Sequence, residues 1–448
     1  MTANRTVKDS RPLWSAASTW ILLLPLLIFA AQVGFSFEVG SKNGAFGGAS
    51  ASIVSPINSD QGHLLQLQTL GAYLLCCLVM LPFIRGLAHD FVRNRLITCF
   101  LCFALLSAFW SSNVTSTLMH ATLLTISVAV AYYLVRRFAP NELMKLTLAV
   151  GASAALGSIL LIGFFPQYGL QDRGGYITGQ WQGIFEQKNI CGFMLTLLLL
   201  PIFYVRISGR YSILARAFYS VILLLIIAET RSVGAWTVCL CCIGFSCELA
   251  ILRRMRHKDR LTIVALSTLA AIGGLSLAIA HWGDLLSAVG RNPTLTGRTT
   301  IWSVLLLSIM KHPILGYGYM GFWQGLRGES ANVGLAMNWP GISYAENGII
   351  ELCLGLGIVG VMIFLLIYAH AVRDAFYCLR RRASHEAMWY TTILVYVAAS
   401  NIESGRLFFP SDLGCILFIA ACVGLRRESD AIRNATPAQR LSDLPAAS

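Results

Sequence analysis

The sequence predicts an all-α polytopic integral membrane protein, and two observations carry that prediction. Hydrophobic residues make up 56% of the 448-residue chain and charged residues only 12%, which is about half the charged fraction of an ordinary soluble domain. The apolar residues gather in runs long enough to cross a bilayer core of about 30 Å as helices. We expect about twelve such helices in a single transmembrane domain over residues 1–425, followed by a cytoplasmic tail over residues 426–448.

Each expected span is an apolar run bounded by polar residues. The first run follows Arg5, Lys8 and Arg11, as the apolar part of a signal sequence would. It is long and lacks a small-residue cleavage site, so we interpret it as an uncleaved anchor. The runs at the third and twelfth positions are short, and only two residues separate the seventh from the eighth. The expected spans are residues 17–37, 65–84, 96–110, 117–135, 143–165, 190–206, 213–229, 232–252, 261–280, 347–370, 387–401 and 411–425.

The Lys and Arg residues alternate between loops and so predict the orientation, because positive residues in short loops are retained on the cytoplasmic side. With the N-terminus placed inside, 25 of the 34 Lys and Arg residues fall in inner segments. We therefore expect both termini in the cytoplasm. The net charge of +13 follows from this topology, so we expect no nucleic-acid partner.

Residues 281–346 form the longest stretch without a membrane-length apolar run, and the alternation of charge places them in a large outer loop. Within this loop, Thr299–Lys311 is apolar but too short to span. This pattern predicts a helix in the membrane interface, with Trp302 at the level of the headgroups. His312–Gly318 contains proline and glycine residues that end the helix and turn the chain.

Several outer residues are candidates for binding an anion. Lys188 and Asn189 open a span, although a snorkelling lysine beside a helix cap is the ordinary explanation. Arg231 lies between two spans, where an arginine usually lines a polar cavity or pairs with an acid. Arg291 and Arg298 lie in a loop, and a solvated charge is the usual explanation for either alone. Together the four cations predict a basic cluster at the outer leaflet.

Acidic and amide residues flank the last spans on the same side. Glu346 and Asn347 begin a span, and a carboxylate at a helix start is the ordinary explanation for Glu346. Glu351 lies inside the apolar run, where that explanation does not apply. Glu403 either belongs to the site or forms a local ion pair with Arg406. The candidate substrate-binding residues are Arg291, Lys188, Asn189, Tyr344, Asn347, Glu351 and Glu403.

The basic cluster predicts a lipid-linked diphosphate as the ligand, because guanidinium groups bind phosphate bidentately. Glu346 is the nearest candidate for a base. The chain has no Walker motif, no Asp-x-Asp pair and no His/Cys set, and its 13 cysteines lie almost entirely in apolar runs. We therefore expect no metal, no cofactor and no nucleotide hydrolysis.

Five short motifs follow one another among the spans. In order and placement they resemble those of the O-antigen ligase and polymerase superfamily, in particular its exopolysaccharide-polymerase branch. The likeness covers about residues 100–410. The motifs are Gly183-x-Phe185-x-x-Lys188-Asn189, Thr230-Arg231-Ser232, Gly297-Arg298-x-x-Ile301-Trp302 with His312-Pro313-Ile314-Leu315-Gly316-Tyr317-Gly318, Glu346-Asn347-Gly348-x-x-x-Glu351 with Leu356-Gly357, and Asn401-x-Glu403-Ser404.

The resemblance implies transfer of a glycan from undecaprenyl diphosphate to an acceptor hydroxyl on the periplasmic face of a bacterial inner membrane. It implies that Arg298 and Arg231 hold the diphosphate. Members of the family often have a histidine where this chain has Glu346, so we hypothesise that this carboxylate either takes the proton of the attacking hydroxyl or orients a sugar. The expected partners are the lipid-linked oligosaccharide, the acceptor glycan, membrane lipids, and chain-length-regulator and flippase proteins.

Three functions fit this pattern. A polymerase uses another lipid-linked repeat unit as the acceptor, whereas a ligase uses the lipid A-core. A transporter or flippase has a similar number of spans, but its charges are expected near the middle of the membrane in repeated halves. Here the exceptional charges gather at one face and no repeat is visible. We therefore expect a metal-independent glycosyltransferase that acts as a glycan polymerase.

Overall fold

The computed structural model describes residues 71, 73–171, 179–255, 298–339 and 341–434. Within these ranges the chain is almost wholly helical, apart from a short antiparallel pair of strands, β1 (Leu170–Gln171) and β2 (Gln180–Trp181). The expected spans at 17–37 and 261–280, the first part of 65–84, and Arg291 lie outside the described residues. The prediction of a mainly α-helical chain is confirmed for the part that is described.

Each expected span within the described ranges corresponds to a helix. A short helix, α8 (Pro166–Gly169), separates two of them. The helices that match spans are the helical segment Tyr73–Arg93, which contains η1 (Leu81–Phe83) and α4 (Ile84–Arg93), α5 (Arg95–Leu106) with η2 (Ser107–Phe109), α6 (Val114–Arg137), α7 (Pro140–Phe164), α9 (Lys188–Leu199) with η4 (Leu200–Phe203), α10 (Ser212–Glu229), α11 (Val233–Arg254), α16 (Gly348–Arg381), α17 (His385–Glu403) and α18 (Leu413–Asn434).

Among the described residues, six helices are long and apolar enough to cross a membrane, and two further apolar helices are shorter. This agrees with a polytopic membrane protein, while the total of twelve spans stays a prediction. The six helices cover Tyr73–Arg93, Val114–Arg137, Pro140–Phe164, Ser212–Glu229, Val233–Arg254 and Gly348–Arg381.

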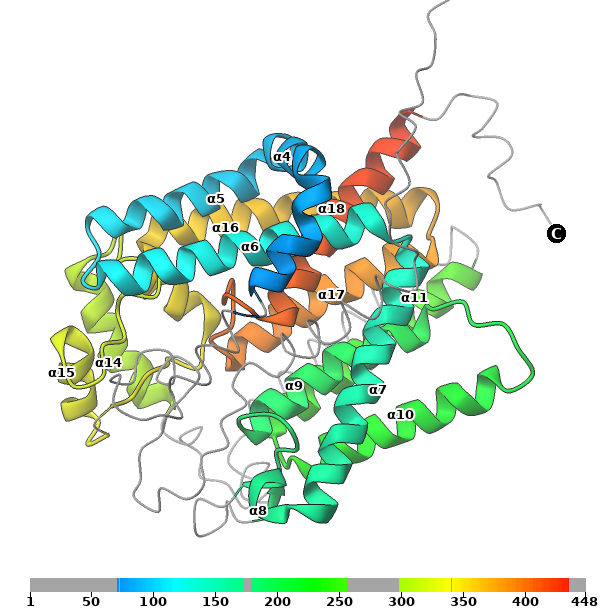
Figure 1. Ribbon diagram of the computed structural model, residues 1–448, viewed down its shortest axis with the longest axis horizontal. Helices are drawn as coiled ribbons and strands as arrows, with labels where there is room; N and C mark the ends of the chain where they lie inside the picture. The colour runs from blue at the N-terminus through cyan, green and yellow to red at the C-terminus, as the bar shows by residue number, and fades with distance from the viewer. Residues whose placement is uncertain (1–70, 72, 172–178, 256–297, 340, 435–448) are drawn as a thin grey trace, which may run out of the picture.

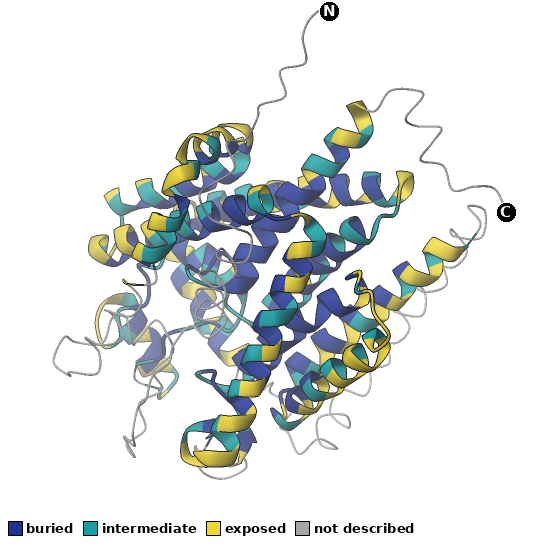
Figure 2. Cartoon of the chain, turned by 45° about the vertical axis from the view of Figure 1, so that its right-hand side comes forward, coloured by how far each residue is buried: buried dark blue, intermediate teal, exposed yellow. Residues whose placement is uncertain are grey.

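The helices form two groups that α17 joins. In one group α5, α6, α16 and α18 pack against one another, and in the other α7, α10 and α11 surround α9 (Figure 1). Helix α17 packs against α16 and α18 on one side and against α11 on the other. Trp389 and Tyr390 of α17 and Phe418 of α18 are among the largest fully buried side chains. The buried residues run through the middle of both groups (Figure 2).

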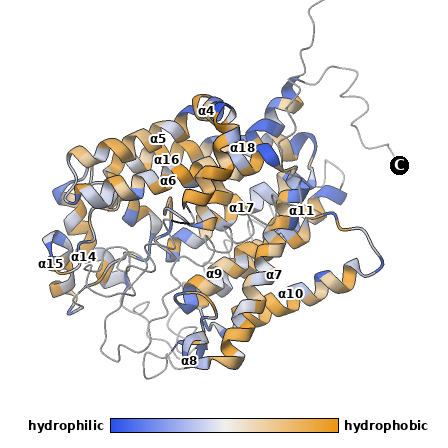
Figure 3. Cartoon of the chain, viewed as in Figure 1, coloured by the Kyte–Doolittle hydropathy of each residue, from blue (hydrophilic) through white to orange (hydrophobic). Residues whose placement is uncertain are grey.

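The outer helices present apolar side chains to the surroundings, as a bilayer requires. Leu214, Phe218, Val221 and Leu225 of α10 are exposed at intervals of three or four residues, so they form a stripe along one helix face. Figure 3 shows the same helix as strongly hydrophobic. An apolar stripe of this length on a soluble protein would be an unusual exposed patch.

The segments predicted to be inner come together at one end of the molecule. Arg136 at the end of α6 and Arg427 of α18 both pair with the buried Asp90 of α4, at 2.9 and 3.2 Å. Arg206 pairs with Glu386 at the start of α17. These pairs support the predicted alternation of loops, although which end faces the cytoplasm stays a prediction.

The helix predicted over Thr299–Lys311 is present as α14 (Arg298–Lys311). It is followed by the turn predicted at His312–Gly318 and then by α15 (Gly328–Ala336). Trp302 donates its indole N–H to the carbonyl oxygen of Ala345 at 2.9 Å, so this side chain is tied to the loop before α16. The position of α14 at a membrane interface stays a prediction.

Glu329 joins α14 to α15, because its carboxylate accepts hydrogen bonds from Lys311 at 2.6 Å and from Ser308 at 3.0 Å. Burial raises the pKa of Glu329, but the hydrogen bonds from Lys311, Asn332 and Ser308 outweigh it and hold the pKa below its ordinary value. A lowered carboxyl pKa contributes stability at neutral pH that is lost as the pH falls through that pKa.

Helix α16 contains a kink at Gly357, where φ is +62° and ψ is −165°. The turn after α14 enters this kink, and the amide of Ile358 donates to the carbonyl oxygen of Pro313 at 2.9 Å. A Cβ atom at position 357 would clash with the backbone of Ile314. The glycine therefore fixes the outer loop against the start of α16.

We expect Gly357→Ala to destabilise the protein by roughly 3 kcal/mol, because it combines an unfavourable backbone conformation with a steric clash. The unfolding midpoint in detergent should fall clearly, as measured by size exclusion after heating. Gly244→Ala in α11 is the matched control, since no described atom outside its own stretch of helix lies within 4 Å of its added Cβ. Equal midpoints for the two variants would contradict this role of Gly357.

Candidate functional site

Arg298 connects two carboxylates from distant parts of the chain. It is the first residue of α14, and its guanidinium pairs with Glu346 in the loop before α16. The same guanidinium pairs with Glu403, the last residue of α17, at 3.2 Å. The Arg298 side chain is only 13% exposed, so these ion pairs are partly shielded from water and stronger than surface pairs. Arg298 thus holds three elements together at one point.

Glu346 lies at the start of α16, as expected, but its side chain is not the cap. Asn347 is the cap, because its side-chain oxygen accepts hydrogen bonds from the amides of Ile349 and Ile350, both at 3.1 Å. Glu346 has a left-handed backbone conformation with φ of +50°, which costs a non-glycine residue about 1 kcal/mol or more. This backbone turns the carboxylate towards Arg298.

Glu351 lies one turn into α16 and is held by two donors. The indole N–H of Trp323 donates to one carboxylate oxygen at 2.8 Å, and the amide of Ala345 donates to the other. Gly405 lies against the same carboxylate, so that an added Cβ would be 2.9 Å from Glu351 Cγ. Glu351 therefore links the start of α16 to the loops around it.

These residues surround a narrow cavity of about 80 Å³. Four of the residues that line it are glutamates, from the loop before α9, the loop before α16, the first turn of α16 and the end of α17. Arg406 also lines the cavity and is paired with the buried Asp412 at 3.0 Å. The lining residues that bear on the chemistry are Glu186, Asn189, Trp323, Ser343, Tyr344, Glu346, Glu351, Glu403 and Arg406.

Comparison with known proteins bears on what such a site does. Residues 218–365 match the family described as O-Antigen ligase, and this segment includes Arg231, Arg298 and Glu346. The chain is also similar to the exopolysaccharide production protein ExoQ of Rhizobium meliloti (strain 1021). Identity is 25% over 317 residues, which cover 68% of this chain and 71% of the relative. Both matches make the chain similar to the O-antigen ligase/polymerase superfamily. The resemblance predicted from the sequence is confirmed, and both matches support a membrane protein of glycan assembly.

Of the four cations expected to form a basic cluster, three lie in the part of the chain that the structure describes. Arg298 is paired with two acids, and Arg291 lies outside the described residues. Arg231 is exposed at the turn between α10 and α11, with φ of +49°. Lys188 is only 9% exposed, and its amide donates to the side-chain oxygen of Gln171 at 3.1 Å. The described cavity is therefore lined by more carboxylates than cations.

The predicted residues nevertheless converge on one site. Asn189, Tyr344, Glu346, Glu351 and Glu403 all line the cavity. The turn that carries Arg231 lies beside it, because an added Cβ at Gly234, three residues further on, would overlap the carboxylate of Glu403.

The local ion pair considered for Glu403 and Arg406 does not form. Glu403 pairs with Arg298 and Arg406 pairs with Asp412, so each side chain has its partner elsewhere.

Sequence reasoning missed Glu186, Trp323 and Arg406 as residues of this site. Glu186 lies two residues before Lys188 in the first motif, where only Lys188 and Asn189 were selected. Trp323 lies in a loop with no polar pattern, and only the fold brings its indole to Glu351. Arg406 was considered only as an ion-pair partner of Glu403. The sequence gave no indication that it pairs with the buried Asp412 instead.

We expect Gly234→Ala in α11 to reduce glycan transfer by about ten- to hundredfold, because a displacement of about 1 Å in a site costs up to that much. The added Cβ would push the Glu403 carboxylate away and break its pair with Arg298. Folding should hardly change, since the clash is with the end of a flexible side chain. Gly244→Ala in the same helix is the control. Full activity with correct folding would show that the Arg298–Glu403 pair is dispensable.

Proposed function

We propose that the protein is a polymerase that transfers an oligosaccharide from undecaprenyl diphosphate to a sugar hydroxyl of another lipid-linked repeat unit. The observation that carries this proposal is Arg298 held between Glu346 and Glu403 beside a cavity lined by polar residues. A cation that already binds two carboxylates has the geometry to bind a diphosphate. The likeness to an exopolysaccharide production protein favours a polymer as the product.

The diphosphate of the donor competes with Glu346 and Glu403 for Arg298. Two phosphate groups carry more negative charge than one carboxylate, and guanidinium binds them bidentately. When Arg298 turns to the diphosphate, the Glu346 carboxylate loses its partner and is free to accept a proton. Arg231, at the turn beside the site, adds a second positive charge for the leaving group. Binding of the donor thereby prepares the base, and no metal ion is required in this scheme.

The chemical step is a displacement at the anomeric carbon of the donor sugar. The acceptor oxygen forms a new bond to that carbon while the bond from the carbon to the diphosphate oxygen breaks. The acceptor proton passes to Glu346, and undecaprenyl diphosphate leaves with its electron pair on oxygen. Because attack and departure are on opposite sides, the configuration of the sugar carbon inverts. Glu351 and Asn189 line the cavity and contact sugar hydroxyls, while Tyr344 offers an aromatic face to a sugar ring.

The site faces the periplasm of a bacterial inner membrane in this proposal. The support is the predicted topology, in which the ends of α17 and the starts of α9 and α16 lie outside. Lipid-linked units from a flippase reach the cavity in the outer leaflet, and a chain-length regulator acts on the growing polymer. Asn347 keeps the start of α16 in place through its cap.

The lipid intermediates of a deletion strain test this proposal. We expect the polymer to be lost while single lipid-linked repeat units accumulate on the outer leaflet. Long lipid-linked polymer that is not attached to the lipid A-core would instead identify a ligase. Absence of outward-facing repeat units would identify a flippase. Either of these two results would overturn the polymerase assignment.

A further inference from the structure

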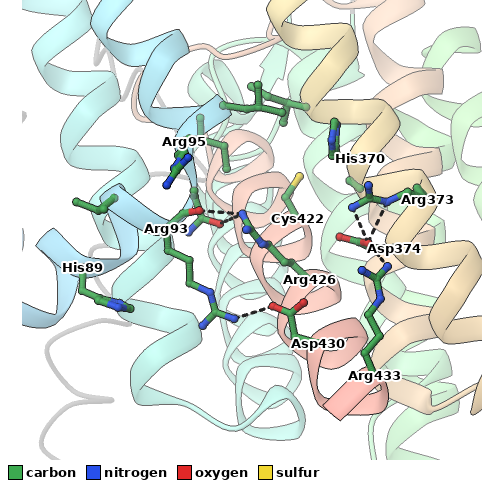
Figure 4. Close-up of a pocket in the computed structure, with 16 residues that line it drawn as sticks. His89, Arg93, Arg95, His370, Arg373, Asp374, Cys422, Arg426, Asp430 and Arg433 are labelled. Carbon is green, nitrogen blue, oxygen red and sulfur yellow. Dashed lines mark hydrogen bonds and ion pairs between the residues drawn. The ribbon is translucent and has the colours of Figure 1, made fainter.

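A second cavity, of about 870 Å³, lies at the opposite end of the molecule from the candidate site. Figure 4 shows that its polar side chains come from the junction of α4 and α5, from α16 and from α18. Five arginines and two aspartates line it, which leaves three positive charges in excess. The charged lining residues are Arg93, Arg95, Arg373, Asp374, Arg426, Asp430 and Arg433.

Two of these arginines carry charges that no described acid neutralises. Arg95 makes no hydrogen bond or ion pair with any residue that the structure describes. Arg426 donates only to neutral acceptors, the carbonyl oxygen of Arg93 at 2.9 Å and the side-chain oxygen of Asn94 at 3.4 Å. The Asp374 carboxylate is shared between Arg373 at 3.1 Å and Arg433 at 3.6 Å. The cavity is therefore suited to an anion.

The same cavity has an apolar wall that continues along two helices. Leu96, Ile97 and Ile367 line it beside the arginines. On α16, apolar side chains are exposed at positions 358, 362 and 366, and the same helix face then continues to His370 and Arg373. On α5, which packs against α16, exposed residues recur at 95, 99, 102 and 106. Both stripes lead from hydrocarbon-facing surface to the basic end.

From these observations we infer that this cavity binds one anionic phospholipid, with its phosphate between Arg95 and Arg426 and its acyl chains along α5 and α16. Basic pockets between transmembrane helices hold lipid headgroups of this kind. The positive-inside rule explains arginines at this end of the molecule, but it does not explain a cavity in which arginines without an acidic partner among the described residues meet two exposed apolar stripes. This lipid site is separate from the site of glycan transfer.

Native mass spectrometry of the full chain in detergent tests this inference. Phosphatidylglycerol is compared with phosphatidylcholine of the same acyl chains, and with glycerol phosphate as the headgroup alone. We expect one phosphatidylglycerol molecule to bind at least about tenfold more tightly than either. Each arginine near a phosphate contributes about fivefold, so Arg95→Gln should weaken binding about fivefold and Arg95→Gln with Arg426→Gln about 25-fold.

Arg380→Gln is the matched control, because it removes the same charge from α16 in a different basic cavity. It should leave phosphatidylglycerol binding unchanged. An equal loss of phosphatidylglycerol binding in Arg380→Gln would overturn the inference, since binding would then depend on the total positive charge at this end of the molecule. Glycerol phosphate that binds as tightly as the lipid would also overturn it, because the site would then be one for a free phosphate. Arg95→Gln breaks no hydrogen bond or ion pair among the described residues, so an equal unfolding midpoint of the variant and the wild-type protein is expected and separates lost binding from misfolding.

Discussion

Glu346→Gln should lower polymer formation by about 10²- to 10⁴-fold, the range that a positioned general base contributes. Glutamine has the shape of glutamate and can still accept a hydrogen bond from Arg298, and Arg298 keeps its second pair with Glu403. The fold should therefore survive while the proton acceptor is lost. The measurement is polymer formed per amount of inserted protein, in a strain that lacks the native copy.

Glu329→Gln is the control for this variant. Glu329 is a carboxylate of the same outer segment that pairs with Lys311 and does not line the candidate cavity. We expect it to keep nearly full activity at neutral pH. Glu346→His should retain part of the activity, because members of the family often have a histidine at this position. Normal polymer from a stably inserted Glu346→Gln protein would end the role of Glu346 as the base.

Arg298→Ala should reduce turnover by about 10²- to 10³-fold, as the loss of one preorganised charge at a leaving group does elsewhere. The change also leaves Glu346 and Glu403 facing one another without the cation that joins them. Arg298→Lys keeps the charge but offers a single ammonium in place of a planar fork. We therefore expect the lysine variant to recover only a small part of the lost activity.

Arg327→Ala separates this effect from a general loss of outer charge. Arg327 is an exposed arginine just before α15, in the same segment as Arg298. It should leave the rate nearly unchanged. If Arg298→Ala is fully active while correctly inserted, the diphosphate assignment is wrong. If Arg327→Ala lowers the rate of transfer as much as Arg298→Ala does, the specific role of Arg298 is wrong.

The hydropathy pattern predicted much of the fold, because the backbone polar groups of each apolar run must be hydrogen-bonded within a helix when the run crosses a bilayer. The helix over Thr299–Lys311 and the turn after it were predicted from an apolar run too short to span followed by proline and glycine. The kink at Gly357 could not be predicted. It depends on the turn after α14 meeting the backbone of α16, and that contact joins residues more than forty positions apart.

The candidate residues were identified from their residue types and from their predicted location on the same side of the membrane. Their interaction partners could not be identified in this way. Charge counting grouped Arg298 with other cations, whereas the fold pairs it with Glu346 and Glu403. Those three residues lie in three different elements, so no local spacing could reveal the pairs. Asn347 was selected as a substrate-binding residue, and its side chain is used to cap α16. Contacts of this kind follow from tertiary packing and cannot be predicted from the spacing of neighbouring residues.

In the proposed mechanism, Arg298 and Glu346 together drive transfer from a lipid diphosphate. The most direct test of this mechanism is the purified full chain in proteoliposomes with a lipid-linked repeat unit, with release of undecaprenyl diphosphate measured beside polymer length. We predict one undecaprenyl diphosphate released per linkage with the wild-type protein, and almost none with Glu346→Gln or Arg298→Ala of equal thermal stability. Equal release by the wild-type protein and these two variants would contradict the account.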